Sequence, residues 1–246
     1  MGVLELDEEK RDGILVHGYA VAGGDLKDHI KYLYYLLTCF DIEMVIIDNA
    51  GYQFIEAANE SALFKGGRLS LDFFEVDTDL EGVEYTRMLQ KARSNYNKER
   101  GKICIKQVFS TEWIRVANQH LQYCIDHRHI WFASNVRANG AGWERAVNSR
   151  IDINLTPFEN TGDLAEFQDD LIYQTKQQCA LVEITTTAKG TQTFDLPQHL
   201  KRDTTDKRAR KDNYTTLLLG NWATKLYFEM RDSKPIENAT FTPFFV

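Results

Sequence analysis

The sequence lacks several patterns, and each absence excludes a class of protein. No apolar run is long enough to span a bilayer, and the N-terminus has no signal-peptide pattern, so we expect a cytosolic protein without a membrane partner. No GxxxxGK[ST] motif occurs, which excludes a P-loop ATPase within the chain. No two cysteines have the CxxC spacing. The four cysteines lie singly in or beside apolar segments, which predicts buried free thiols instead of zinc ligands or disulfides.

The chain also lacks an excess of positive charge. Its net charge is −7, so a nucleic-acid partner would have to be held by a local basic patch and not by the overall field. Hydrophobic residues make up 43% and charged residues 26% of 246 residues, which is typical of a globular protein. This length is sufficient for one large domain of α/β type.

The residue pattern of the N-terminal third predicts the central strands of a mixed sheet. Residues 3–6 and 14–22 alternate as the two strands of a hairpin, and a helix capped by Asp25 follows. Residues 44–48 then form an apolar strand, which we expect to be covered on both faces and central in the sheet. Because a crossover helix makes neighbouring strands parallel, this strand is expected beside the hairpin.

The remaining elements follow from periodicity and turn residues. We predict helices over 52–61 and 84–96, strands over 69–76 and 103–108, a helix capped by Ser110, an extended segment over 130–133, a surface loop over 135–142, a helix from Asp163, a hairpin of 181–187 with 191–196, and a long C-terminal helix before a tail.

Asp48 ends the apolar strand and is the first candidate site residue. An ionised carboxylate at the end of a buried strand requires a cation or hydrogen-bond donors, which favours a metal-binding or catalytic role. The alternative interpretation is that Asp48 only caps the helix that follows the Asn-Ala-Gly turn. Both interpretations fit the local sequence.

Asp212 begins the last helix and is the second candidate. Helical steps from Asp212 reach Leu219, Trp222 and Leu226, which predicts an acid on the core-facing side. The alternative is an acid stabilised by the helix dipole and by basic neighbours. Two such acids suit a site for Mg²⁺ or Mn²⁺, and a basic run beside Asp212 would meet phosphates. The members of this run are Lys201, Arg202, Lys207, Arg208, Arg210 and Lys211.

A histidine-rich segment, residues 124–129, is a third candidate site, and it has two interpretations. The segment Cys-Ile-Asp-His-Arg-His could in principle bind a metal ion, but no second cluster stands at zinc-like spacing. A polar helix end is the interpretation that the pattern favours.

The ordered set of motifs resembles one family, the C-terminal nuclease domain of the terminase large subunit, the DNA-packaging motor protein of tailed bacteriophages. The resemblance covers nearly the whole chain. It is carried by Val-Ile-Ile-Asp-Asn-Ala-Gly-Tyr at 45–52, Phe-Asp-Leu-Pro at 194–197, and Arg-Lys-Asp-Asn-Tyr at 210–214 continuing to Ala223.

The resemblance implies an α/β domain with an RNase H-like mixed sheet flanked by helices and an additional β-hairpin, spanning residues 1–233, with a tail over 234–246. It implies two divalent metal ions, Mg²⁺ or Mn²⁺, that cut double-stranded DNA during packaging. Asp48 and Asp212 match the family's acids, and the hairpin around Lys189 matches an insertion close to DNA. The expected partners are DNA, the terminase ATPase domain, the small terminase subunit and the portal protein, at the procapsid in the host cytoplasm.

The chain departs from the family pattern in one respect that bears on activity. The family's first metal-binding Asp lies on a strand before the hairpin, and here nothing precedes Met1, so we expect that strand and that ligand to be missing. Two alternatives therefore stay open. One is a catalytically incomplete module that binds DNA, portal or small subunit, and the other is a different RNase H-like enzyme of the resolvase or integrase type.

Overall fold

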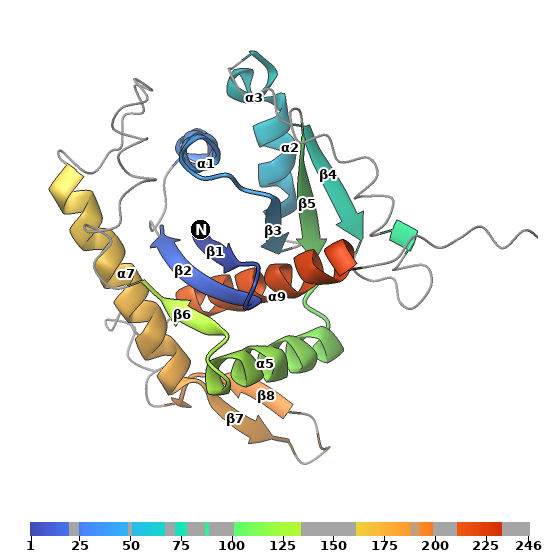
Figure 1. The fold of residues 1–246 in the computed structure, drawn as a ribbon, viewed down its shortest axis with the longest axis vertical. Coiled ribbons are helices and arrows are strands. Elements are labelled where there is room, and N and C mark those ends of the chain that lie inside the picture. Colours follow the sequence, from blue (N-terminus) through green and yellow to red (C-terminus); the bar gives the residue numbers. More distant parts are fainter. Residues whose placement is uncertain are drawn as a thin grey trace, which may run out of the picture.

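The computed structural model describes residues 1–19, 25–48, 51–66, 72–77, 87–88, 101–133, 161–187, 190, 192–198 and 211–232. In this part of the chain, helices combine with small sheets in a mixed α/β arrangement. Figure 1 shows a long C-terminal helix across the middle of the molecule and a separate two-stranded hairpin at one end.

The N-terminal hairpin forms the first sheet. β1 (Gly2–Asp7) pairs antiparallel with β2 (Asp12–Gly18), and β6 (Ile130–Phe132) pairs parallel with the other edge of β2. The predicted hairpin is therefore confirmed, and so is the presence of a mixed sheet. The extended segment predicted near residue 130 supplies the third strand.

The strand that carries Asp48 belongs to a different sheet. β3 (Met44–Asp48) and β4 (Asp72–Asp77) both lie parallel to β5 (Gly101–Gln107), in the order β3-β5-β4. The expectation that β3 lies beside the hairpin is wrong, since its partner among the described strands is β5. β3 is also an edge strand there, and each of its residues is partly exposed, so complete cover on both faces is wrong too.

Two helices begin at the predicted caps. The Asp25 carboxylate accepts a hydrogen bond from the Lys27 N–H (3.0 Å) before α1 (Leu26–Cys39). The Ser110 hydroxyl accepts one from the Trp113 N–H (3.1 Å) before α5 (Thr111–Asp126). Each side chain satisfies one of the backbone donors that a helix start leaves unpaired.

The α1 helix forms a small core with two following helices. α2 (Tyr52–Glu60) and α3 (Ala62–Gly66) pack with it, and Phe64 is among the most deeply buried side chains at 1% exposure. The predicted helix over 52–61 is confirmed.

The second predicted hairpin is also confirmed. α7 (Thr161–Leu181) leads into β7 (Glu183–Thr186), which pairs antiparallel with β8 (Gln192–Asp195). Gly190 lies in the turn with φ +80°, a left-handed conformation that glycine adopts without steric cost. Its N–H donates to the Thr187 carbonyl (2.8 Å), so the turn closes where the Lys-Gly pair predicted it.

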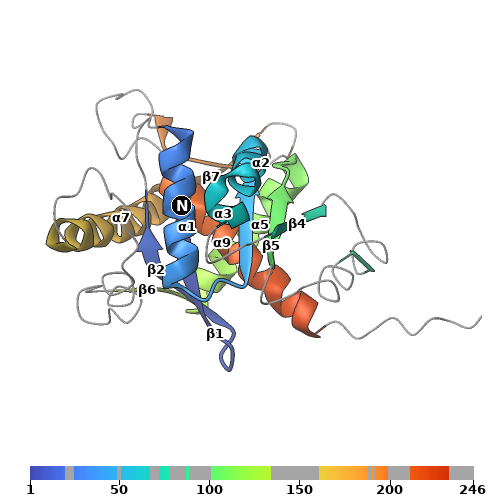
Figure 2. The ribbon, with the colours of Figure 1, turned by 90° about the horizontal axis from the view of Figure 1, so that it is seen from above.

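The C-terminal helix α9 (Asp212–Asp232) connects the cores of the fold. It contacts α5, α7, the hairpin strands and β3, and Figures 1 and 2 show it passing across the molecule. Leu217, with 0% exposure, packs in the core formed by α5, β2 and β6. Leu226, also at 0%, packs instead against Ile103 and Ile105 of β5. One helix therefore supplies side chains to both sheets.

Several predicted segments lie wholly or partly outside the described residues. They are the beginning of the strand over 69–76, the helix over 84–96 apart from residues 87–88, the loop over 135–142, the basic run over 201–210 and the tail over 234–246.

The Ser110 cap gives a first test of the fold. Ser110→Ala is expected to lower the free energy of unfolding by about 1 kcal/mol, because the Trp113 N–H loses its acceptor. Urea unfolding followed by circular dichroism measures the change. Ser110→Asp restores an acceptor at the same position and is expected to recover most of the loss; an equal loss in both variants would contradict a capping role.

Candidate functional site

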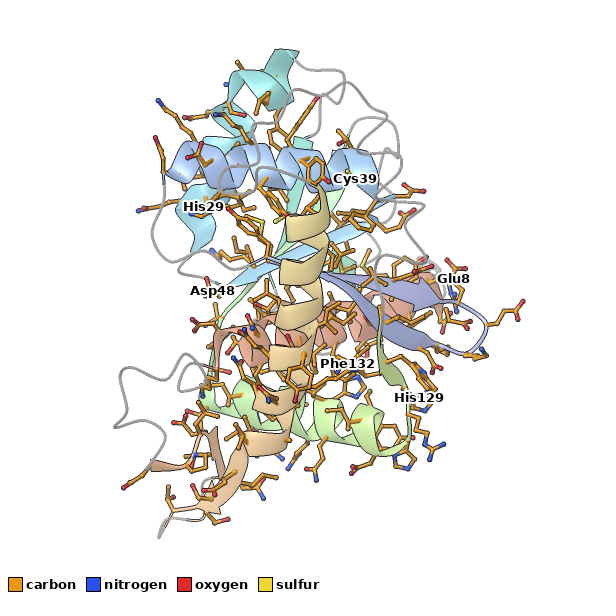
Figure 3. The ribbon with its side chains drawn as sticks, turned by 90° about the vertical axis from the view of Figure 1, so that its left-hand side faces the viewer. Glu8, His29, Cys39, Asp48, His129 and Phe132 are labelled. Atoms are coloured by element: carbon orange, nitrogen blue, oxygen red, sulfur yellow. The ribbon has the colours of Figure 1, made fainter. Side chains whose placement is uncertain are left out.

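Asp48 lies at the carboxyl edge of the parallel sheet, where Figure 3 labels it at the end of β3. Its register partner in β5 is Gln107, and β4 ends one position earlier in the register, where Asp77 pairs with Lys106. Three parallel strands thus end at the same edge of the sheet, and two of them end in an aspartate. The carboxyl edge of a parallel sheet is the place where open α/β folds bind ligands.

The Asp48 carboxylate has one hydrogen-bond partner among the described residues. Oδ1 accepts the Gly51 N–H at 2.7 Å, and Gly51 is the N-cap residue of α2. A Cβ on Gly51 would stand 2.5 Å from Ile47 Cδ1 and 3.2 Å from Asp48 Oδ1, so a larger residue here would force the Ile47 side chain to move. This hydrogen bond therefore holds the turn before α2, but it is not a helix cap, since the N-cap is Gly51 and α2 has no side-chain cap hydrogen bond. It also fixes the orientation of the carboxylate, and Oδ2 takes no hydrogen bond from another described residue.

Gln107 is the neighbour that the sequence analysis missed. Its side chain is 1% exposed, and Nε2 donates to the Val108 carbonyl at 2.9 Å. Oε1 is buried without a hydrogen-bond partner in the described part of the chain. A buried carbonyl oxygen left unpaired is energetically costly, which makes it a candidate ligand atom. The available signal was a polar residue at the end of an apolar strand, in the same place as Asp48.

Asp212 does not face the core. It is the first residue of α9 and its side chain is exposed, so the predicted inward orientation is wrong. The buried residues of α9 begin with Tyr214, whose N–H donates to Gln178 Oε1 at 2.8 Å. Asp212 lies in the turn before this core begins. An exposed acid in the first turn of a helix matches the alternative interpretation, favourable interaction with the helix dipole.

Asp48 and Asp212 lie in different surroundings. The β3 side chains Met44 and Ile46 pack with Leu226 and Met230 in the C-terminal half of α9. The start of α9 instead contacts α7 and β8 through Tyr214 and its neighbours. Within the described ranges, no group of three or more His, Cys, Asp or Glu residues is arranged to hold a metal ion.

Lys211 is the one predicted DNA contact that the structure describes. Its Nζ donates to the Phe194 carbonyl at 3.0 Å and lies 3.6 Å from Asp195 Oδ1, so the ammonium joins α9 to β8. This contact also links two of the segments that carry the family resemblance. The other predicted contacts lie outside the described residues: Lys189, Lys201, Arg202, Lys207, Arg208 and Arg210.

The cysteines are free thiols, as expected. Cys39, Cys104 and Cys124 are buried and Cys179 is partly buried. Burial raises the pKa of the Cys179 thiol to about 12, and it also raises the pKa of Cys39 and of Cys124. A thiol held in its protonated form is a poor nucleophile, so these residues serve packing.

The search for a membrane span and the comparisons with known proteins are both negative. Among the helices that the structure describes, none combines the length and apolar character needed to cross a bilayer. Protein-family models, curated proteins and solved structures yield no match to this chain.

Proposed function

We propose that the chain is a divalent-metal-dependent endonuclease domain that cuts double-stranded DNA during viral genome packaging, as its resemblance to terminase nuclease domains implies. The observation that carries the proposal is the pairing of Asp48 with Gln107 at the carboxyl edge of the parallel sheet. There a carboxylate of fixed orientation stands in register with a residue whose buried carbonyl oxygen lacks a partner.

These two residues fit the proposed ion. Carboxylate and amide oxygens are the ligands that Mg²⁺ prefers, and Mn²⁺ accepts the same donors. When bound, such ions activate water and stabilise the leaving oxygen in phosphodiester hydrolysis. The Gly51 N–H holds Asp48 Oδ1, so the carboxylate is oriented before any ion binds. Asp212 is the second proposed ligand, a role that rests on the family resemblance.

DNA contact is proposed for the basic residues around the start of α9. Lys211 lies beside Asp212, and the basic run over 201–210 leads directly into it. Lysine and arginine side chains contact phosphates without reading the bases, which suits cleavage with little sequence preference. In this role the domain would work with the terminase ATPase domain, the small subunit and the portal protein, at the procapsid in the host cytoplasm.

Removal of the metal tests this proposal. The protein is expected to nick supercoiled plasmid DNA in Mn²⁺, to lose all nicking in excess EDTA, and to regain it when Mn²⁺ is restored. Gel electrophoresis separates the supercoiled and nicked forms, and calorimetry with Mn²⁺ alone measures binding without DNA.

Two other outcomes have defined meanings. A shift of DNA mobility without cleavage at any Mn²⁺ or Mg²⁺ concentration would contradict the nuclease and support the binding module. Cleavage confined to branched DNA, with linear and supercoiled duplexes intact, would instead support an enzyme of the resolvase type.

A further inference from the structure

The second chemically distinctive place lies where α5 ends and β6 begins. Figure 3 shows His129 and Asp48 on opposite sides of α7, so this place is separate from the carboxyl edge of the parallel sheet. The helix ends as the sequence analysis expected, with His127 as its C-cap. The arrangement of the two histidines and of Asp12 goes beyond what a helix end requires.

The chain reverses at Arg128 and brings both histidines to one side. Arg128 has φ +61°, and its N–H donates to the Ile125 carbonyl at 3.1 Å, while the His129 N–H donates to the Cys124 carbonyl at 2.7 Å. These two hydrogen bonds define a Schellman motif, in which the residue with positive φ is usually glycine. As a result the imidazoles of His127 and His129 are nearly parallel, with 10° between their planes and 6.5 Å between their centroids.

Both imidazoles have their Nδ1 atoms engaged by groups that accept hydrogen bonds. His127 Nδ1 lies 2.9 Å from the Tyr123 carbonyl oxygen, and His129 Nδ1 lies 2.8 Å from Asp12 Oδ1. A carbonyl or an ionised carboxylate can only accept, so Nδ1 carries the proton in each ring. In the neutral imidazole, Nε2 then bears the lone pair. Two neighbouring histidines are thus held in the tautomer that binds metal through Nε2.

The Asp12 carboxylate holds the His129 imidazole in a fixed orientation. Its residue exposure is 7%, and Oδ2 accepts the Trp131 indole N–H at 3.1 Å while Oδ1 holds the imidazole. A carboxylate that accepts from the second nitrogen of a histidine is the usual outer partner of a metal-binding imidazole, which it orients and makes more basic. The imidazoles themselves remain accessible, since His127 is exposed and the His129 side chain is 39% exposed.

We propose that His127 and His129 form a two-histidine site for a borderline divalent transition-metal ion such as Zn²⁺, with Asp12 as a positioning residue. Imidazole pairs select Zn²⁺, Cu²⁺ or Ni²⁺ over Mg²⁺, so this site differs in chemistry from the oxygen site proposed at Asp48. Two imidazoles on one tetrahedral ion with metal–nitrogen bonds of about 2.0–2.1 Å hold their ring centroids about 5 Å apart, so the two rings, now 6.5 Å apart, would move closer by roughly 1.5 Å to share an ion. Water would complete the coordination of the ion, since the described residues add no third ligand of the His, Cys, Asp or Glu type.

The experiment is a calorimetric titration of the reduced protein with ZnCl₂. Wild type is expected to bind one Zn²⁺ per chain in the presence of a large excess of Mg²⁺. His127→Ala and His129→Ala are each expected to weaken binding at least about 10-fold, and Asp12→Asn by about 10- to 100-fold, the range for loss of an outer partner. His29→Ala is the matched control, because it removes a histidine on another helix and should leave Zn²⁺ binding unchanged.

Two results would overturn the site. One is the absence of Zn²⁺ binding by wild type at millimolar metal, and the other is wild-type affinity in His127→Ala. His127 is exposed, so this variant keeps its fold even if the loss of Asp12 or His129 disturbs β2 and β6. Asp48→Asn should leave Zn²⁺ binding unchanged, so failure of the Zn²⁺ site and failure of the proposed nuclease are distinguishable.

Discussion

Replacement of Asp48 by Asn is expected to reduce Mn²⁺-dependent plasmid nicking by about 100-fold or more, the scale of loss when one electrostatic contact to the reacting centre is removed. The substitution removes the negative charge that an ion requires. It keeps an oxygen that can accept the Gly51 N–H, so the turn into α2 is retained. Gel densitometry of the nicked plasmid gives the rate.

A second substitution at the same position separates the two roles of Asp48. Asp48→Ala removes the charge and also the acceptor, and is expected to lower the free energy of unfolding by about 1 kcal/mol, as for the loss of one hydrogen bond. Asp48→Asn should leave the unfolding midpoint nearly unchanged. If Asp48 served only to hold the turn before α2, the Asn variant would nick DNA at the wild-type rate and the Ala variant would lose only stability.

Asp28→Asn is the matched control for charge. Asp28 is an exposed acid on α1 that pairs with Lys31, so its substitution changes the net charge equally and should not change nicking. Asp212→Asn tests the second proposed ligand. Since Asp212 is exposed, the variant should fold normally, and an unchanged nicking rate would remove Asp212 from the site while leaving Asp48 in it.

The parts of the fold that the sequence predicted correctly are those determined by local chemistry. Asp25 and Ser110 begin their helices because their side chains accept backbone N–H groups, a preference visible in any sequence. The turn at Gly190 follows from the φ that glycine tolerates. None of these features depends on a distant residue.

The partner of β3 could not be predicted in the same way. Its apolar residues fit a strand beside the hairpin as well as one beside β5, whose residues begin more than fifty positions later in the chain. A strand pattern fixes which side chains alternate, but it does not fix which strand lies alongside. For this reason the position of Asp48 at a strand end was predicted correctly, whereas the neighbour that makes it a candidate site, Gln107, was not.

The prediction that Asp212 faces the core was wrong for a related reason. α9 packs against helices and against strands of both sheets, so its buried residues lie on more than one side of the helix, with Leu217 on one face and Leu226 and Met230 on the opposite face. Counting helical steps identifies a core-facing side only when a helix has one apolar stripe. On α9 several stripes are equally buried, and the stripe through Asp212 reaches the core only further along the helix.

Because α9 is buried in two cores, truncation of one of its buried leucines is the second substitution for which we expect a large effect, here on stability. Leu217→Ala is expected to lower the free energy of unfolding by about 2–5 kcal/mol, the range for a fully buried leucine whose cavity does not collapse. Leu217 is 0% exposed and belongs to the core of α5, β2 and β6. Leu26→Ala is the matched control, because Leu26 is 45% exposed and the same truncation there should change stability by about 0.5 kcal/mol or less.

Leu226→Ala extends this test to the other core. Leu226 is equally buried but packs against Ile103 and Ile105 of the parallel sheet, so its truncation should cost a similar 2–5 kcal/mol or so. Because one continuous helix carries both leucines, both variants should unfold in a single transition, with lower urea midpoints and unchanged slopes. Two separate transitions in the Leu226 variant, with only one of them shifted, would instead show that the sheets unfold independently and that α9 does not couple the Asp48 site to the N-terminal hairpin.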